Sequence, residues 1–373
     1  MEWKEDILGN VLEVKYGKDH KKLADGQYPV YGSGGLMRYV DSKLYDGPSI
    51  LIPRKGTLNN IMFVESPFWT VDTMFWSIIN TDKVDPKFLF YSICKRDFAS
   101  MNVGSAVPSM TVNILNDIQI SYPKNIDDQR RIASILSSLD RKIELNNKIN
   151  ADLEEMAQAL FKNWFVDFEP FKDGKFVDSE LGMIPEGWRV GSPYEYVKVV
   201  YGAPYKSAKF NDNGEGLPLI RIRDLKDCNP QFYTPEILPQ TEYVNMGDIV
   251  AGMDAEFVPH IWKGKTGLLN QRVCKLMPQQ TSISNLFVLY LMKPELEFVQ
   301  SYKTGTTVSH LGKADIDKFV VVLPPLEVVE ECSKLLDSIL QRIKNISAES
   351  RNLSTLRDTL LPRLMSGELE IPE

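Results

Sequence analysis

Asn229 and Pro230, in the stretch "CNPQF", are the residues of this chain that come nearest to a catalytic motif. The Asn-Pro-Pro-Tyr motif of adenine methyltransferases has a second proline, which is missing here. The stretch "YGSGG", which begins at Tyr31, has the composition of a cofactor-binding loop, but it lies in a different part of the chain. The two stretches do not combine into one site, so we do not expect methyl transfer by this chain itself.

Phosphate and metal chemistry are no better supported. The stretch "WKGKTG" has the Gly-Lys-Thr end of a phosphate-binding loop, but Pro259 stands where that loop requires its first glycine. The three histidines, His20, His260 and His310, are too far apart to indicate a metal site or a Ser-His-Asp site. The four cysteines show no metal-binding or disulfide spacing, so free, buried thiols are expected. We therefore predict a chain without catalytic residues, metal or cofactor.

Composition favours a soluble protein of several domains. The chain has 373 residues, 43% of them hydrophobic, which is too long for one ordinary core. No apolar run approaches the roughly 18 residues of a membrane span, and the N-terminus is charged. We expect a cytoplasmic protein. The net charge of −7 argues weakly against nucleic-acid binding, but the acidity is concentrated in residues 167–186 and in two helical stretches, so the larger segments can carry local basic patches.

Two long helices are predicted, one within 126–166 and one within 324–373. Each has apolar residues at alternating steps of four and three, the pattern of a coiled-coil seam, and Pro362 should end or kink the second helix. Two helices in one chain are at high effective concentration, so we expect an antiparallel intramolecular pair; homodimerisation through the seams is the alternative. Asn146 would then lie near Ser350 and could set the register. The predicted seam residues are Ile132, Leu136, Leu139, Ile143, Leu153, Leu160, Leu336, Ile339, Ile343, Ile346, Leu353 and Leu360.

The chain also repeats itself. "SMNVGSAVPSMTVNILNDIQISYP" parallels "SYKTGTTVSHLGKADIDKFVVVLP", and "WKEDILGNVLEVKYG" parallels "WRVGSPYEYVKVVYG". The span between these two matches is longer in the second copy. A constant frame with a variable middle is typical of a recognition module whose specificity changes while its scaffold does not.

The fold class that follows is α+β, because short β-rich runs alternate with turns and with helical stretches in both copies. We predict a first mixed α/β domain over 1–125, a central long helix over 126–166 and a connector over 167–186. A second mixed α/β domain over 187–323 and a C-terminal long helix over 324–373 complete the chain.

The order of several short motifs resembles that of the DNA-specificity subunit of type I restriction-modification systems, over nearly the whole chain. The motifs are "DGPSILIPRKGT", "PFWTVDTMFW", "ALFKNWFVDFEPF", "DSELGMIPEGW" and "LRDTLLPRLMSGEL". Such helices usually open with a Glu-Gln pair, which Asp128-Gln129 echoes and the second helix lacks. The resemblance implies two target recognition domains, each reading one half of an asymmetric bipartite site in double-stranded DNA. It also implies helices that set the spacer and dock two modification (methyltransferase) subunits.

Candidate DNA contacts are side chains on polar loops that could reach phosphates or base edges. An ordinary polar turn is the alternative for each of them. In the first domain they are Ser33, Gly34, Arg38, Arg54, Lys55, Thr57, Asn59, Asn60, Ser105, Ser109 and Thr111. In the second they are Tyr205, Lys206, Ser207, Lys209, Arg221, Arg223, Lys263, Lys265, Asn270, Gln271, Arg272, Lys303, Thr304, Thr306, Thr307, Ser309 and His310.

The function predicted from these observations is a non-catalytic, sequence-specific DNA-binding subunit. The competing hypothesis is a two-headed protein-interaction adaptor that does not bind DNA. The half-site sequences, the spacer length and the presence of restriction or motor subunits cannot be read from the sequence, because base contacts depend on loop conformation and DNA deformation.

Overall fold

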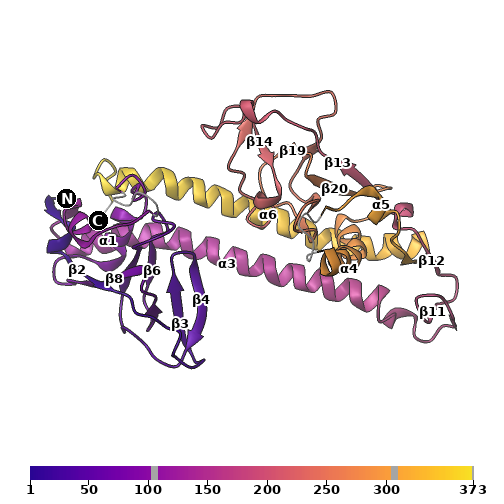
Figure 1. Ribbon diagram of the computed structural model, residues 1–373, viewed down its shortest axis with the longest axis horizontal. Coiled ribbons are helices and arrows are strands. Elements are labelled where there is room, and N and C mark those ends of the chain that lie inside the picture. Colours follow the sequence, from indigo (N-terminus) through magenta and orange to yellow (C-terminus); the bar gives the residue numbers. More distant parts are fainter. Residues whose placement is uncertain (102–107, 304–309, 372–373) are drawn as a thin grey trace. The chain divides into compact units, whose positions relative to one another are not determined.

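The structure is a computed structural model that describes residues 1–101, 108–303 and 310–371 (Figure 1). It mixes helices and strands, which confirms the α+β class. The contacts divide the chain into two compact units. Unit 1 comprises Met1–Ile143 and Asn352–Glu373, and unit 2 comprises Glu144–Arg351. These limits differ from the predicted domain boundaries, because each unit includes part of both long helices.

The two long helices are α3 (Ile126–Phe165) and α6 (Leu326–Met365). Helix α3 begins where Asn125 Oδ1 accepts a hydrogen bond of 2.9 Å from the amide of Asp127. Asp127 and Asp128 in the first turn suit the positive end of the helix dipole. Helix α6 runs past Pro362 to Met365, so of the two predicted effects of this proline the end of the helix is wrong, and a kink stays a prediction. A proline removes one backbone donor, and in the last turn that loss does not terminate the helix.

Unit 1 contains two larger sheets. The main sheet has the strand order β2-β8-β5-β6 and the second sheet has the order β4-β3-β7. A separate antiparallel pair joins β1 to β9. The elements are β1 (Trp3–Ile7), β2 (Leu12–Tyr16), β3 (Tyr28–Gly32), β4 (Gly35–Val40), β5 (Ser49–Pro53), β6 (Met62–Val64), β7 (Trp69–Thr70), β8 (Met74–Ile79), α1 (Pro86–Ile93), α2 (Val112–Asn116) and β9 (Gln119–Pro123).

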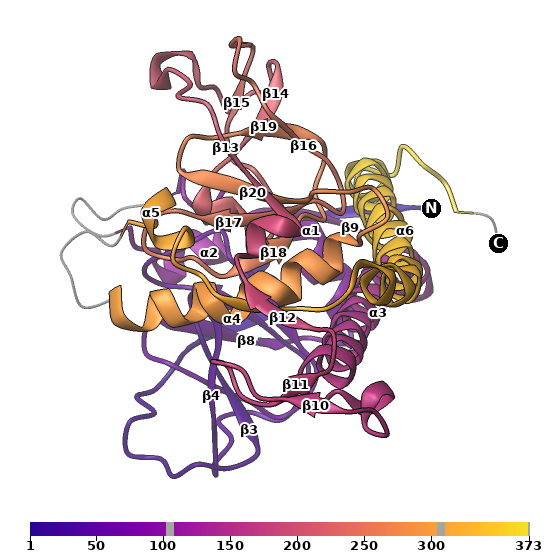
Figure 2. The same cartoon turned by 90° about the vertical axis from the view of Figure 1, so that its right-hand side faces the viewer.

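Unit 2 has a main sheet of order β13-β20-β17-β18 and a second sheet of order β15-β14-β19-β16. Helix α4 packs against β20, β18 and β17 of the main sheet (Figure 2). The elements are β10 (Phe176–Val177), β11 (Ile184–Pro185), β12 (Arg189–Gly191), β13 (Val197–Tyr201), β14 (Leu217–Ile220), β15 (Tyr233–Thr234), β16 (Tyr243–Val244), β17 (Ile249–Gly252), β18 (Pro259–Ile261), β19 (Gly267–Leu269), β20 (Val273–Pro278), α4 (Asn285–Lys303), α5 (Lys313–Ile316) and β21 (Val321–Leu323).

The main sheets of the two units correspond strand by strand. Both are antiparallel throughout, and β2, β8, β5 and β6 take the places of β13, β20, β17 and β18. The registers agree as well: Leu12 pairs with Ile79 in unit 1, and Val197 pairs with Pro278 in unit 2. The central pairing of Ile52 with Phe75 likewise has its counterpart in Ala251 with Cys274.

The two stretches that match in the sequence are hydrogen-bonded to each other in each unit. Lys4 pairs with Tyr122 across β1 and β9, and Arg189 pairs with Leu323 across β12 and β21. The beginning and the end of each sequence copy therefore form one antiparallel ladder. This explains why both matches stay constant while the span between them changes length.

The second sheets carry most of the difference in length. In unit 1, β3 turns directly into β4 through Ser33 and Gly34. In unit 2, residues 221–232 separate β14 from β15, and the additional strand β16 pairs with β19. The variable middle of the sequence thus lies in these sheets and in the loops between their strands.

Candidate nucleic-acid interface

Two predicted contact residues, Arg54 and Lys55, follow directly after strand β5 in unit 1. The amide of Met110 donates a hydrogen bond of 2.9 Å to the carbonyl of Arg54, and Lys55 forms an isolated antiparallel bridge with Ser109. Residues from two distant stretches of the sequence therefore meet at one end of the main sheet.

The turn between β3 and β4 contributes to the same place. Asn60 Nδ2 donates a hydrogen bond of 2.8 Å to the carbonyl of Ser33. Gly56 lies in the loop that follows β5 and has a φ of +88°. A Cβ at this position would lie 3.0 Å from Ser33 Oγ. We call Ser33, Arg54, Lys55, Asn60 and Ser109 the unit 1 loop cluster.

Tyr16 is a neighbour of this cluster and is not among the predicted contacts. It is 55% exposed at the end of β2, and the Arg54 guanidinium lies 5.3 Å from its ring centroid. A cation over an aromatic face is attracted to it, which restrains Arg54. An exposed aromatic residue in the stretch "VKYG" was the available signal, but without the fold nothing linked it to Arg54.

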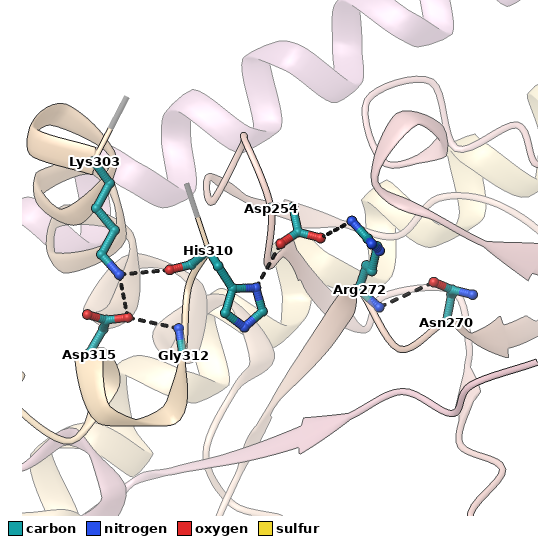
Figure 3. Close-up of polar contacts among 7 residues, drawn as sticks. All are labelled: Asp254, Asn270, Arg272, Lys303, His310, Gly312 and Asp315. Carbon is teal, nitrogen blue, oxygen red and sulfur yellow. Dashed lines mark hydrogen bonds and ion pairs between the residues drawn. The ribbon is translucent and has the colours of Figure 1, made fainter. Parts of the chain in front are cut away.

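Asp254 organises the corresponding place in unit 2, two residues after the end of strand β17. Figure 3 shows its carboxylate between Arg272 and His310. Its Oδ2 lies 2.8 Å from Nη1 of Arg272, and its Oδ1 lies 2.7 Å from Nδ1 of His310. Arg272 and His310 are among the predicted contacts, whereas the carboxylate that joins them has no signal in the sequence. We call Asp254, Asn270, Arg272, Lys303 and His310 the unit 2 loop cluster.

Lys303 and Asn270 complete this cluster (Figure 3). Lys303 Nζ donates to the carbonyl of His310 at 2.7 Å and to Asp315 Oδ2 at 2.6 Å. Burial alone would raise the pKa of Asp315, but the hydrogen bonds from Lys303 and from the Gly312 amide outweigh burial and lower it. Asn270 is buried, and its Oδ1 accepts a hydrogen bond of 3.2 Å from the Arg272 amide.

The two clusters occupy equivalent backbone positions. The Met110 amide bonds to Arg54 in unit 1, and the Leu311 amide bonds to Met253 in unit 2, at 2.7 Å. The next residues, Lys55 and Asp254, therefore correspond to each other. By the same comparison Ser109 corresponds to His310, since the isolated bridges pair Lys55 with Ser109 and Asp254 with His310.

Arg272 has Thr73 as its counterpart in unit 1. The carbonyl of Thr73 accepts the Arg54 amide at 2.9 Å, and the carbonyl of Arg272 accepts the Met253 amide at 2.9 Å. One backbone arrangement thus presents lysine, serine and threonine in unit 1, and aspartate, histidine and arginine in unit 2.

Other predicted contacts in unit 1 have partners within the protein. Arg38 Nη2 donates to the Leu23 carbonyl at 2.7 Å. Asn59 Nδ2 donates to Asp97 Oδ1 at 3.2 Å, and Thr111 caps helix α2 through its side chain. These contacts give the three residues a structural role in ordering the loops. DNA contact by them remains a prediction.

Three predicted residues of unit 2 hold the second sheet and its loops. Tyr205 is buried, and its hydroxyl bonds to Thr241 Oγ1 at 3.0 Å. Lys209 Nζ lies 2.8 Å from Oε1 of the buried Glu236, whose Oε2 accepts the Lys206 amide at 2.9 Å. The backbone bond to Lys206 and the Lys209 ammonium lower the pKa of Glu236.

Arg221 and Lys263 are paired as well. Arg221 Nε lies 3.2 Å from Asp224 Oδ2, and its guanidinium lies 4.4 Å from the Phe232 ring centroid. Lys263 Nζ lies 2.6 Å from Glu154 Oε1 on helix α3. Both cations are partly neutralised, which weakens the case for direct phosphate contact.

The remaining predicted contact residues fall into two groups. Those exposed to solvent are Gly34, Thr57, Ser207, Arg223, Lys265 and Gln271. Those that lie outside the described residues are Ser105, Thr304, Thr306, Thr307 and Ser309.

The predicted seam residues of α3 and α6 are all buried or half-buried. In unit 1, Ile132 and Leu136 belong to the core that also holds β2, β5 and α1, and Leu360 packs against it. In unit 2, Leu153, Leu336 and Ile343 belong to the core around α4, with Leu160, Ile339 and Ile346 packed against it. Leu139, Ile143 and Leu353 are half-buried.

Polar contacts join α3 to α6 in each unit. In unit 1, Arg357 Nη1 lies 2.7 Å from Asp140 Oδ1. In unit 2, Asn146 Nδ2 donates to Glu349 Oε2 at 2.9 Å and Asn150 Nδ2 donates to Ser347 Oγ at 3.0 Å. Asn146 thus contacts the residue before Ser350. Residues later in α3 contact residues earlier in α6 within unit 2, so the helices run in opposite directions there.

Within the described residues, no group of three or more His, Cys, Asp or Glu side chains could hold a metal ion. In the same part of the chain, no helix is both long and apolar enough to cross a membrane.

Comparison with known proteins identifies relatives over most of the chain. The family model "Type I restriction modification DNA specificity domain" matches residues 1–155 and 185–353. The type I restriction enzyme MjaIX specificity subunit of Methanocaldococcus jannaschii is 26% identical over 95% of this chain and 86% of its own length. The HindI specificity subunit of Haemophilus influenzae is 24% identical over 83% of each chain.

A solved structure has a similar fold. The crystal structure of the type I restriction-modification system S subunit from M. genitalium superimposes with a TM-score of 0.59. The alignment covers 100% of this chain and 97% of that one at 13% sequence identity.

Proposed function

Because the chain belongs to the family of type I restriction-modification DNA specificity domains, we propose that each of its two units reads one half of an asymmetric bipartite DNA site. The chain is a specificity subunit and not a catalytic component of such a system. Catalysis then belongs to separate subunits.

One observation carries the proposal: the same backbone arrangement presents different side chains in the two units. Lys55 and Ser109 stand in unit 1 where Asp254 and His310 stand in unit 2. Base pairs differ in the donors and acceptors that they present in the major groove. To read two half-sites of different sequence, two units with the same backbone arrangement must present different hydrogen-bond donors and acceptors.

The clusters also suit DNA in their mixture of groups. Arg54 and Lys55 are available for phosphates, which provide sequence-independent affinity. Neighbouring hydroxyl and amide groups, such as Ser33 and Asn60, can meet base edges. With a net charge of −7 the chain has more acidic than basic side chains, so we propose that partner subunits supply much of the phosphate contact.

We further propose that α3 and α6 form an antiparallel intramolecular coiled coil that sets the spacer between the half-sites. The contact of Asp140 with Arg357 in unit 1, and that of Asn150 with Ser347 in unit 2, support pairing within one chain over homodimerisation. The units would act as target recognition domains, with 1–125 and 187–323 as their bodies and 167–186 as a connector. The helices would dock two methyltransferase subunits, and the complex would work in the cytoplasm.

The proposed function is tested with the chain co-purified with its methyltransferase subunits. Binding to a library of random duplexes is measured at several salt concentrations, and the bound fraction is sequenced. We expect affinity to fall steeply with salt and the selected duplexes to share two short motifs at a constant separation. A protein-interaction adaptor would show neither a salt slope nor a selected motif, which would refute the proposal.

The spacer is tested separately by inserting one heptad into each long helix, after Ile143 and after Arg351. Seven residues lengthen a helix by about 10 Å and keep the apolar seam in phase. Since base pairs are about 3.4 Å apart, we expect the gap between the motifs to grow by about three base pairs. A matched variant with the same insertion in the connector at Asp178 should leave the gap unchanged.

A further inference from the structure

We propose that Asp254 is a specificity-determining residue that holds Arg272 in position to read a guanine in the half-site bound by unit 2. The inference rests on the proposed function, since it assigns one base contact within it. Asp254 itself would be a positioning residue, and Arg272 would touch the base.

The geometry of the carboxylate supports this role. The Asp254 side chain is 19% exposed, and the Arg272 side chain is 66% exposed. Arg272 Nη1 and His310 Nδ1 occupy one carboxylate oxygen each, at 2.8 and 2.7 Å (Figure 3). The mostly buried Asp254 carboxylate thus restrains the exposed Arg272 guanidinium through one of its nitrogens, Nη1. The guanidinium has five N–H donors and one bonds to Asp254, so enough remain to donate to the two paired acceptors of a base.

The backbone around Asp254 is also restrained. The amide of Met253, the residue before Asp254, donates a hydrogen bond of 2.9 Å to the carbonyl of Arg272. The backbone at Asp254 is therefore tied to the backbone at Arg272. Ala255, which follows, has a φ of +61°, a left-handed conformation that costs a non-glycine residue free energy. Such strain persists where the surroundings impose it, and it concentrates at functional sites. The counterpart in unit 1, Gly56, adopts a φ of +88° without that cost.

The chemistry points to guanine. Guanine presents N7 and O6 side by side in the major groove, and a planar guanidinium can donate to both. A free arginine is also attracted to phosphates, but a carboxylate at 2.8 Å offsets its charge and repels phosphates. The pairing therefore favours a neutral base edge with two acceptors over the backbone. In unit 1, Lys55 replaces the carboxylate and Thr73 replaces the arginine, so the other half-site should lack this contact.

The test uses the complex with its methyltransferase subunits, selection from random duplexes, and two variants, D254N and R272K. R272K keeps the positive charge and loses the planar fork, and D254N keeps the shape and loses the charge. We expect both variants to lose roughly tenfold or more of the preference for guanine at one position of one half-site. The other half-site and the spacer should be unchanged.

A matched control comes from another arginine-carboxylate pair of unit 2, Arg189 with Glu195. Both side chains are exposed, and neither residue is a predicted DNA contact. R189K and E195Q make the same chemical changes and should leave all base preferences as they are. If D254N lowers the thermal unfolding midpoint, R272K decides the question, because Arg272 is exposed and its replacement removes no core contact.

Three outcomes would overturn the inference. One is that the guanine preference survives in R272K. Another is that both variants weaken binding to all duplexes equally, as a phosphate contact would. The third is that the wild-type half-site read by unit 2 contains no guanine. A wild-type complex that selects no motif at all would refute the proposed function instead, so the two failures are distinguishable.

Discussion

Arg357 on α6 and Asp140 on α3 form an ion pair with 2.7 Å between Nη1 and Oδ1, although 217 residues separate them in the chain. The hydroxyl of Tyr91 on α1 donates to the other oxygen of Asp140 at 2.5 Å. Burial and the neighbouring carboxylate raise the pKa of Tyr91, so its hydroxyl remains a donor. In unit 1, Asp140 therefore connects both long helices and the helix beside the main sheet.

We predict that D140A lowers the free energy of unfolding by about 1–3 kcal/mol, because it leaves the buried Tyr91 hydroxyl without its acceptor and removes one of the two carboxylates paired with Arg357. Urea unfolding followed by circular dichroism measures the change. The control is D358A, which removes the neighbouring, exposed partner of Arg357 and should cost under about 1 kcal/mol. Equal losses in the two variants would show that Asp140 contributes no more than a surface charge.

The buried pair of Asn150 and Ser347 leads to a second prediction. Asn150 is 4% exposed, and its Oδ1 has no hydrogen-bond partner within the described residues. A buried asparagine in a helical seam costs stability and fixes register. The double variant N150L/S347A should therefore raise the unfolding free energy by about 1 kcal/mol, since both polar partners are replaced together.

The same variant should loosen the register between α3 and α6. The complex assembled with it should then select DNA sites with a broader range of gaps between the two motifs. S347A alone is the control, because it leaves the Asn150 amide without its acceptor and should destabilise by about 1 kcal/mol. A double variant less stable than wild type would contradict this account of the polar layer.

The left-handed residues after β5 and β17 give a matched pair of substitutions. A255G should be neutral or stabilise by up to about 1 kcal/mol, because glycine adopts the φ of +61° without steric cost. G56A should destabilise by about 1 kcal/mol, because alanine would be forced to a φ of +88°. The neighbouring Ser33 Oγ can move, so backbone strain accounts for most of that loss. Chemical unfolding of both variants in parallel tests the opposite signs.

His260 should make stability depend on pH. Burial lowers its pKa below the usual 6.5; Glu256 and Glu154 oppose this shift, and Lys263 and Lys293 add to it. The folded state therefore favours the neutral imidazole, while the unfolded state takes up a proton below about pH 6.5. The neutral His260 side chain therefore contributes to the free energy of unfolding above about pH 6.5, and this contribution is lost as the pH falls toward the pKa of His260 in the folded state.

We expect the unfolding free energy of the wild type to fall between pH 7 and pH 5 more steeply than that of H260Q. The difference in slope cannot exceed about 1.4 kcal/mol per pH unit, the value for one proton. Denaturant titrations of both proteins at several pH values measure it. Parallel curves would show that His260 titrates alike in both states.

Several elements were predictable from local patterns. The stretches "SILIPRKGT", "GDIVAGM" and "RVCKLMP" contain β5, β17 and β20, and both long helices appear where the apolar steps of four and three indicated them. The fold class and the family role are confirmed as well. The strands and helices depend on side-chain periodicity and turn chemistry, which are local in the chain. The family role followed instead from the resemblance of the short motifs.

The sequence by itself determined the α+β elements, the paired copies and the absence of a recognisable catalytic motif, because each is written in spacing and residue type. Only the tertiary structure decided which polar residues meet. Asp254 carried no sequence signal, yet it joins Arg272 to His310, while Arg38 and Tyr205 looked available and are engaged internally. Contacts between residues far apart in the chain depend on strand register and loop closure, and those arise from packing the whole unit.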